Sequence, residues 1–332
     1  MKKINLGNTE IQVTIMGLGH CDFGTKVGKE AAFKVLDAYV EEGGNFIDTS
    51  NNYAIWNPGG KGGECETVIG EWMKSRGNRD RIVLATKVGA NIEDLDKVRK
   101  PDGTLVDDWY LHGEGLSKKA VQKAIEGSLR RLQTDYVDLY YAHVEDPSVD
   151  PAETLETFDG LVKQGKIRSI GCSNHTSWRI ERARQISRQR GLAEYCCTQD
   201  LHSYLSPLPS RRLHFANPDK MDYLKNNPDM TLIAYTPTIW GKYAKMHTEK
   251  GAEFWGEFYT IETERKLKAL TRVAQAHNTS EISIVYAWLI RNTPSAIPLI
   301  ATSSVEHLRE NMAAAEIVLS KDEMDLLNNP VD

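Results

Sequence analysis

Four residues of this chain have side chains that could together protonate a carbonyl group: Asp48, Tyr53, Lys87 and His143. Asp48, Lys87 and His143 each close a short β-type run, and Tyr53 follows Asp48 by five residues in a polar stretch. Side chains at the carboxyl ends of different strands converge on one point in a parallel barrel. An acid, a phenol, an ammonium and an imidazole at such a point are suited to acid–base chemistry on a carbonyl compound.

The chemistry assigns each of the four a separate role. A phenol is a weak acid at neutral pH, and a nearby ammonium group lowers its pKa. We expect Lys87 to supply that charge, Asp48 to hold Lys87 in place, and His143 to orient a substrate oxygen. Tyr53 would donate a proton to a carbonyl oxygen, or accept one from an alcohol in the reverse reaction. Because no side chain supplies a hydride, a nicotinamide cofactor is implied.

Each of these residues also has an ordinary structural explanation. Asp48 could cap a turn, Tyr53 could be half-buried, Lys87 could be solvated, and His143 could be a hydrogen-bonded core histidine. These explanations account less well for the joint pattern, in which all four lie at strand ends or just beyond them.

The runs that end in these residues belong to a series of eight. The eight β-type runs end near Gly19, Asp48, Lys87, His143, Ser173, Gln199, Thr236 and Leu299. Most are continuously apolar, as expected for parallel strands covered on both faces. Helical patterns lie between them, so the sequence predicts a (β/α)8 barrel formed by one domain over residues 1–332. A doubly wound sheet is the alternative, although no G-x-G-x-x-G follows the first run.

The remaining segments have predicted places around this barrel. Residues 1–14 read as a β-hairpin that closes the barrel bottom. Three stretches, 91–117, 202–229 and 239–262, are too long to be simple connections. Because each follows a strand end, we expect all three on the active face.

Composition excludes several classes of protein. The net charge of -5 and the absence of a Lys/Arg run argue against a nucleic-acid surface. We see no signal peptide and no apolar stretch of membrane-spanning length. The five cysteines include no CxxC pair, so we expect reduced thiols in a cytoplasmic protein. A homo-oligomer is compatible with the sequence.

Several motifs carry a resemblance to a known family. They are Gly17-Leu18-Gly19, the segment 46–53 (FIDTSNNY), Ala85-Thr86-Lys87, the segment 129–140 (LRRLQTDYVDLY) leading to His143, the segment 163–174 (KQGKIRSIGCSN) and the segment 307–311 (HLREN). With these motifs the chain resembles the aldo-keto reductase family, in the family's order and over nearly its whole length. The resemblance implies a (β/α)8 barrel and NAD(P)H-dependent reduction of an aldehyde or ketone to an alcohol. It also implies the tetrad of Asp48, Tyr53, Lys87 and His143, with Tyr53 as general acid.

The resemblance further implies a cofactor site. Ser173, Asn174 and Gln199 would hold the nicotinamide amide, which side chains offering both donors and acceptors can fix. Tyr235 would stack on the nicotinamide ring. The other residues expected to contact the cofactor are Gly19, Thr236, Thr238, Trp240, Gly241, Thr302, Ser303, His307, Glu310 and Asn311.

The adenosine end departs from the family pattern. Family members selective for NADPH often place a Lys and an Arg around the 2′-phosphate, where this chain has Ala301 and His307. Thr302 and Ser303 precede a predicted helix, and could bind a phosphate or serve as a plain helix cap. We expect NADP(H) rather than NAD(H), with a preference loosened by this departure.

The residues expected around the substrate are unusually polar: His20, Cys21, Asn52, Trp109, Glu145 and His202. Polar groups can pair with hydroxyls while an indole packs on a ring face, which favours a sugar or another polar carbonyl compound. The plainer explanation is that these residues lie in solvated loops.

Two other functions are weighed against reduction. The first is a nucleotide-binding regulatory barrel with little turnover, because some barrels of this resemblance serve as channel subunits. The second is a metal-dependent hydrolase, which predicts His-x-His or carboxylate clusters at strand ends. The sequence has no His-x-His, so we expect no metal.

Overall fold

The fold is a closed barrel of parallel strands. The computed structural model describes residues 1–209 and 214–330. Its eight barrel strands follow one another in the order β10-β3-β4-β5-β6-β7-β8-β9. They are β3 (Gly17–Gly19), β4 (Phe46–Asp48), β5 (Val83–Val88), β6 (Val137–Ala142), β7 (Ile167–Ser173), β8 (Tyr195–Leu201), β9 (Thr231–Tyr235) and β10 (Ala296–Ile300). The (β/α)8 prediction is confirmed and the doubly wound alternative is wrong.

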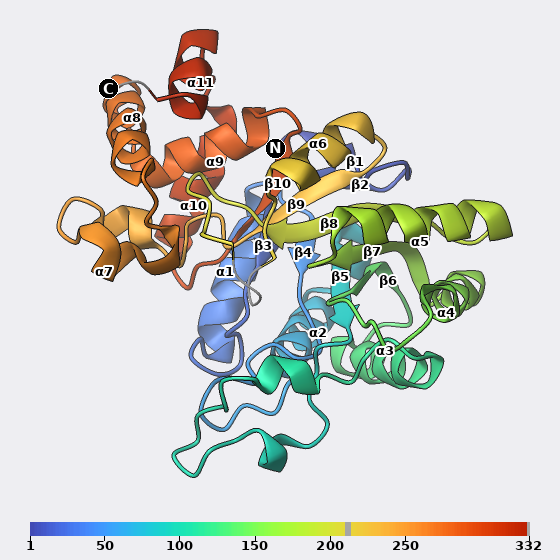
Figure 1. The fold of residues 1–332 in the computed structure, drawn as a ribbon. Helices are drawn as coiled ribbons and strands as arrows, with labels where there is room; N and C mark the ends of the chain where they lie inside the picture. Colours follow the sequence, from blue (N-terminus) through green and yellow to red (C-terminus); the bar gives the residue numbers. More distant parts are fainter. Residues whose placement is uncertain (210–213, 331–332) are drawn as a thin grey trace.

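Helices surround the barrel (Figure 1). They are α1 (Lys29–Glu41), α2 (Glu64–Arg76), α3 (Lys118–Leu132), α4 (Pro151–Lys163), α5 (Ser177–Arg190), α6 (Pro218–Asn226), α7 (Gly251–Trp255), α8 (Thr263–Ala276), α9 (Glu281–Arg291), α10 (Val305–Ala313) and α11 (Lys321–Asn328). None of the helices within the described ranges is both long and apolar enough to cross a membrane.

The strands are buried on both faces. Phe46, Leu139 and Ile233 fill the barrel interior. Their neighbours Ile47 and Tyr140 belong to the core between the strands and the helices. Because successive side chains of a strand point to opposite faces, a strand covered on both sides must be apolar throughout. This explains why the sequence shows continuous apolar runs.

An N-terminal hairpin closes the bottom of the barrel, as predicted. It pairs β1 (Lys3–Asn5) with β2 (Gln12–Thr14) in antiparallel register. Leu6 of the hairpin joins the cluster that fills the barrel interior. The backbone N–H of Gly7 donates to Thr231 Oγ1 at 2.7 Å. A Cβ atom on Gly7 would lie 2.0 Å from the carbonyl oxygen of Cys196, so this contact requires glycine.

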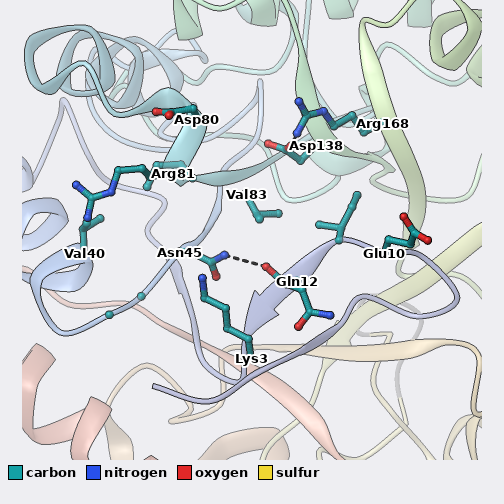
Figure 2. Close-up of a pocket in the computed structure, with 14 residues that line it drawn as sticks. Lys3, Glu10, Gln12, Val40, Asn45, Asp80, Arg81, Val83, Asp138 and Arg168 are labelled. Carbon is teal, nitrogen blue, oxygen red and sulfur yellow. Dashed lines mark hydrogen bonds and ion pairs between the residues drawn. The ribbon is translucent and has the colours of Figure 1, made fainter.

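A hollow of about 600 Å³ lies between this hairpin and the strand starts, lined by residues that Figure 2 shows. The four predicted catalytic residues lie at the other ends of the strands. Asn45 Nδ2 donates to the backbone oxygen of Gln12 at 2.8 Å. Asp138 accepts from Arg79 Nη2 and Arg168 Nη1, each at 2.8 Å. Several polar groups of this hollow therefore pair with one another, and in a barrel of this kind this face serves stability.

The three long stretches all follow barrel strands on the opposite face, as predicted. The stretch 91–117 follows β5 and contains short 3₁₀ turns, and the stretch 239–262 follows β9 and contains α7. The stretch 202–229 follows β8 and contains α6, a helix that the sequence reading did not identify; residues 210–213 of this stretch lie outside the described residues.

Replacing Asp138 should destabilise the fold without affecting chemistry at the other end of the barrel. Its carboxylate also accepts from the backbone N–H of Leu84 at 2.9 Å, and its side chain is 2% exposed. We expect Asp138→Ala to lower the free energy of unfolding by about 3 kcal/mol, because it leaves the N–H of Leu84 unpaired and removes the carboxylate that balances the partly buried Arg79. Urea denaturation measures this change.

The matched control is Arg168→Ala, because the Arg168 side chain is 55% exposed. This variant should lose less than about 1 kcal/mol. Equal losses for the two variants would contradict the role assigned to Asp138.

Candidate active site

The barrel brings the four predicted catalytic residues together. Asp48 ends β4, Lys87 lies near the end of β5, and His143 directly follows β6. These strands are neighbours, and their register sets Asp48 beside Ala85 and Lys87 beside Tyr141. Tyr53 lies in the turns that follow β4.

Lys87 is the centre of this group. Its Nζ atom donates to Asp48 Oδ1, to the backbone oxygen of Thr49 at 2.8 Å and to Tyr53 Oη at 2.8 Å. Lys87 and Asp48 are fully buried. An ammonium group has three hydrogens to donate, so all of them are used. Since Tyr53 Oη accepts one of them, the hydroxyl hydrogen of Tyr53 must point elsewhere and is available to a ligand.

The ionisation of Tyr53 differs from the expectation. Burial raises the pKa of the Tyr53 phenol well above its ordinary value, and the negative charge of Asp48 adds to that rise. The Tyr53 pKa is therefore not lowered in this structure as expected, because burial disfavours the phenolate and the charge of Asp48 adds to that effect. Tyr53 keeps its proton at neutral pH, as a proton donor requires. Lys87 can stabilise the phenolate as it forms.

Burial acts on the two charged partners in opposite directions. It raises the pKa of the Asp48 carboxyl, and the charge of Lys87 opposes this rise. It lowers the pKa of the Lys87 ammonium, and the charge of Asp48 opposes that fall. Each group thus favours the charged form of the other.

The His143 ring lies beside Tyr53. The two ring centroids are 6.1 Å apart, in an edge-on arrangement. Burial, and then the charge of Lys87, lower the pKa of His143 well below its ordinary value, so the imidazole is neutral at neutral pH. Its Nδ1 atom lies 3.1 Å from Ser50 Oγ. Ser50 is not among the site residues that the sequence predicted, although it lies between Asp48 and Tyr53 in the chain, and that position could have indicated it.

Several expected nicotinamide contacts lie on the neighbouring strands. Ser173 ends β7, Gln199 lies in β8 and Tyr235 ends β9. Asn174 donates from Nδ2 to the backbone oxygen of His143 at 3.1 Å and to Ser173 Oγ at 3.0 Å. Its Oδ1 accepts from Tyr235 Oη at 2.9 Å.

Gln199 makes a contact that the sequence reading did not anticipate. Its Nε2 atom donates to Asp48 Oδ2 at 2.9 Å. Asp48 is thereby bonded on one oxygen by Lys87 and on the other by Gln199. A residue expected at the cofactor thus belongs to the hydrogen-bond network of the tetrad.

The segment after β9 has an unusual backbone. Ile239, Trp240 and Gly241 have φ angles of 49°, 52° and 80°, and Thr236 has a φ of 53°. A left-handed conformation costs a non-glycine residue about 1–2 kcal/mol. Consecutive turn-forming N–H groups can form a concave site for an anion. The N–H groups of Ile239 and Gly241 already donate to the backbone oxygens of Thr236 and Thr238, at 3.1 and 3.0 Å, so the pyrophosphate contacts expected for Thr236, Thr238, Trp240 and Gly241 stay a prediction.

The expected adenosine contacts lie around the start of α10. Ser304 is the N-cap of this helix and accepts from the backbone N–H of His307 at 3.3 Å. Thr302 Oγ1 accepts from the backbone N–H of Ser304 at 3.1 Å. Glu310 Oε1 accepts from Ser280 Oγ at 2.9 Å. Ser303 and His307 are exposed, and Asn311 is partly exposed. Gly19 lies at the end of β3, which is a neighbour of β10.

Trp109 lies on the Tyr53 side of the site. The ring centroids of Tyr53 and Trp56 are 6.0 Å apart, and those of Trp56 and Trp109 are 6.2 Å apart. Arg99 Nη2 donates to the backbone oxygens of Ile55 at 2.9 Å and Gly60 at 2.8 Å. These bonds hold the stretch 91–117 against the segment that follows Tyr53.

The other expected substrate residues differ in their surroundings. Asn52 is buried and bonds with Ser50. His20 stacks on a neighbouring phenylalanine ring at 4.5 Å. Cys21 is partly exposed, and burial raises the pKa of its thiol to about 11.

Glu145 and His202 contact other parts of the fold. Glu145 accepts from Thr176 Oγ1 at 2.9 Å and pairs with Arg179 at 3.1 Å, at the start of α5. His202 packs on Trp288 of α9, with ring centroids 5.5 Å apart. Residue type alone did not indicate these structural partners. Among the residues that the structure describes, no group of three His, Cys, Asp or Glu side chains could hold a metal ion.

Comparison with known proteins places this barrel and its strand-end residues in one family of oxidoreductases. The model of the aldo/keto reductase family matches residues 15–330, so the chain belongs to that family. It is 30% identical to the uncharacterized oxidoreductase YrpG of Bacillus subtilis, over 99% of this chain and 95% of that protein. It is 30% identical to the aryl-alcohol dehydrogenase [NADP(+)] of Phanerodontia chrysosporium, over 91% and 76%. It is 28% identical to norsolorinic acid reductase B of Dothistroma septosporum, over 95% and 77%.

The buried His202 ring should make folding sensitive to acid. Burial lowers the pKa of His202 from 6.5 to about 4, so the folded state favours the neutral ring. Its contribution to stability is full above pH 6.5 and is lost as the pH falls through 4. When the pH falls from 7 to 4, the free energy of unfolding should fall by about 3 kcal/mol less in His202→Leu than in the native chain.

Urea denaturation at both pH values measures this difference. His112→Leu is the control, because the His112 side chain is 48% exposed. A His202→Leu variant with the pH dependence of the native chain would show that His202 is not the titrating group.

Proposed function

We propose that this chain is an NADP(H)-dependent carbonyl reductase that converts an aldehyde or ketone to an alcohol, with Tyr53 as general acid. The observation that carries the proposal is the direction of the hydrogen bonds at Lys87. All three ammonium hydrogens are donated, one of them to Tyr53 Oη, so Tyr53 keeps its own hydrogen for a ligand.

The proposed mechanism divides the work among the four residues. A bound NADP(H) supplies the hydride that reduces the carbonyl carbon. Tyr53 donates its proton to the carbonyl oxygen, and Lys87 stabilises the phenolate that this leaves. Asp48 keeps Lys87 charged and in place, and His143 hydrogen-bonds a substrate oxygen and orients it. In alcohol oxidation the Tyr53 phenolate accepts the proton.

The chain offers a fitting set of groups for the cofactor. We propose that Ser173, Asn174 and Gln199 hold the nicotinamide amide and that Tyr235 packs on its ring. We propose phosphate contacts for the segment after β9, from groups other than the N–H of Ile239 and Gly241, which donate to Thr236 and Thr238 within the turn.

The proposed preference for NADP(H) over NAD(H) rests on fewer residues than the proposed nicotinamide site. The named dependence of one relative on NADP(+) supports it. Arg309 is the one permanent cation in segment 301–311, and it pairs with Glu42 of the segment after α1 at 2.8 Å. The 2′-phosphate would therefore depend on Thr302, Ser303 and His307.

We propose a polar carbonyl substrate, such as a sugar, whose ring packs against Trp109. The aromatic series from Tyr53 through Trp56 to Trp109 supports a ring-shaped ligand. The name of one relative, an aryl-alcohol dehydrogenase, favours aromatic compounds as the competing class. Turnover of aldoses compared with aromatic aldehydes separates the two, and clear preference for the aromatic aldehydes would reject a sugar substrate.

The remaining parts of the proposal are a single barrel domain, a small-molecule substrate and a cytoplasmic location, with homo-oligomers allowed. All five cysteines are free thiols in the structure, which supports a reducing compartment. The regulatory alternative shares the intact tetrad, and it would replace the catalytic proposal if nucleotide binds without turnover of any carbonyl compound.

Removing the Tyr53 hydroxyl should abolish reduction. We expect Tyr53→Phe to lower kcat by about a thousandfold, because the proton donor is lost while the ring remains. NADPH binding, measured by quenching of tryptophan fluorescence, should change by less than about twofold, since the hydroxyl is assigned to the carbonyl oxygen. Tyr110→Phe is the control, because Tyr110 is exposed. Surviving activity would show that Tyr53 is not the acid.

Adding a cation at the start of α10 should strengthen the choice of NADPH. We expect His307→Arg to raise the ratio of kcat/KM with NADPH to that with NADH by about tenfold, because a charge-assisted bond to a phosphate contributes about 1.4 kcal/mol. His247→Arg is the control, since the exposed His247 pairs with Glu281 elsewhere. An unchanged ratio would show that the 2′-phosphate does not lie beside α10.

A further inference from the structure

A second phenol lies beside the buried ammonium group of Lys87. Lys87 and Tyr141 are paired residues of β5 and β6, and Tyr141 belongs to the cluster that fills the barrel interior. Lys87 Nζ lies 5.5 Å from the centre of the Tyr141 ring and 4.6 Å from the centre of the Tyr53 ring. Both distances are within the range of a cation–π interaction. The proposed mechanism assigns no role to Tyr141.

The neighbouring strand β7 leaves room for the Tyr141 ring. Gly171 is the residue of β7 that pairs with Tyr141. A Cβ atom on Gly171 would lie 2.9 Å from the Tyr141 ring and 2.7 Å from Cys197 Sγ. The φ angle of Gly171 is not positive, so this position requires glycine for space and not for its backbone conformation. Tyr141 is completely buried, and its ring cannot move away from Lys87 unless the barrel interior repacks.

The ring of Tyr141, and not its hydroxyl group, is the part that can act on Lys87. The ammonium group donates its three hydrogens elsewhere, so none remains for the Tyr141 hydroxyl. That hydroxyl makes no hydrogen bond of ordinary geometry with any residue that the structure describes, although, after Lys87 and Gln199, it further opposes the rise that burial causes in the pKa of Asp48. The face of an aromatic ring is electrostatically negative and attracts a cation. The Tyr141 ring therefore favours the charged form of Lys87.

Burial acts against that charged form. It lowers the pKa of Lys87, and the charge of Asp48 opposes the fall. Because burial also raises the pKa of Tyr53, Lys87 is the first of the two to lose its proton as the pH rises. The titratable groups that face Lys87 are Asp48 of β4, Tyr53 after β4, Cys21 after β3, Glu66 of α2, Tyr141 of β6 and His143 after β6.

We propose that Tyr141 is a positioning residue whose ring keeps Lys87 an ammonium group, and that it thereby extends to higher pH the range in which the protein reduces carbonyl compounds. This inference rests on the proposed carbonyl reduction. In that reaction the charge of Lys87 stabilises the Tyr53 phenolate, and a neutral amine cannot do so. Reduction should therefore slow as the pH rises and Lys87 loses its proton.

The first test measures the single-turnover rate of hydride transfer from NADPH as a function of pH. Tyr141→Leu removes the ring, and the midpoint of the alkaline fall in rate should move down by about one pH unit. Tyr141→Phe keeps the ring without the hydroxyl, and its midpoint should stay within about 0.3 pH unit of the native one. An unmoved midpoint in Tyr141→Leu, or equal shifts in both variants, would overturn the inference.

The matched control is Tyr140→Leu. Tyr140 precedes Tyr141 in β6 and is also completely buried, but it belongs to the core between the strands and the helices, with its ring 5.5 Å from that of Phe158. Tyr140→Leu should lose stability in urea as Tyr141→Leu does, because each change leaves a cavity. Its alkaline midpoint should be that of the native chain. An equal shift in Tyr140→Leu would assign the effect to lost packing and overturn the inference.

The second test observes Lys87 without turnover. In NMR spectra of protein with ¹³C-labelled lysine, with Lys87→Arg used to assign the signal, the ε-carbon of Lys87 should titrate about one pH unit lower in Tyr141→Leu than in the native chain. Equal midpoints would overturn the inference, whatever the turnover. If the protein reduces no carbonyl compound with either cofactor, the proposed function fails instead, and the NMR titration still decides whether Tyr141 acts on Lys87.

Discussion

A buried ammonium group is the constraint on which the rest of the site depends. Lys87 is fully buried, and an unpaired charge at such a position would cost several kcal/mol. Its partners Asp48, Thr49 and Tyr53 come from β4 and the turn after it, so β4 and β5 must pair in one register. A slip of one residue would turn Lys87 to the opposite face of the strand. The same bonds that stabilise the barrel therefore orient the phenol.

This constraint explains the electrostatic state of the site. Burial raises the pKa of Tyr53 and lowers the pKa of His143, so both are neutral at neutral pH. The charge of Lys87 is balanced by Asp48 in the same buried space. The site thus has a protonated donor and no net charge facing a ligand, and the ammonium acts on the phenolate only when a proton leaves.

The sequence was sufficient for the barrel strands and for the tetrad, because continuous apolar runs mark strands and their ends mark one face. The sequence did not predict where side chains point beyond a strand end, because the alternation of a strand stops there. His202, for example, follows β8 but packs on Trp288. The shift of the Tyr53 pKa depends on how deeply the phenol is buried, and residue type does not reveal burial. Helix α6 lies in the stretch 202–229, for which the sequence predicts only a long connection, although Asn217 caps the helix and Pro218 is suited to its first turn.

The proposed cofactor side and the proton-donating side of the barrel share hydrogen bonds. Gln199 donates to Asp48, and Asn174 donates to the backbone oxygen of His143. A nucleotide amide that bonds to Gln199 or Asn174 would therefore act on the partners of the tetrad as well. The link from Gln199 to Asp48 is buried and the link from Asn174 to His143 is partly buried, so we expect nucleotide binding at these side chains to be coupled to the positions of Asp48 and His143. A residue assigned to cofactor binding in this barrel thus also has a share in placing the acid.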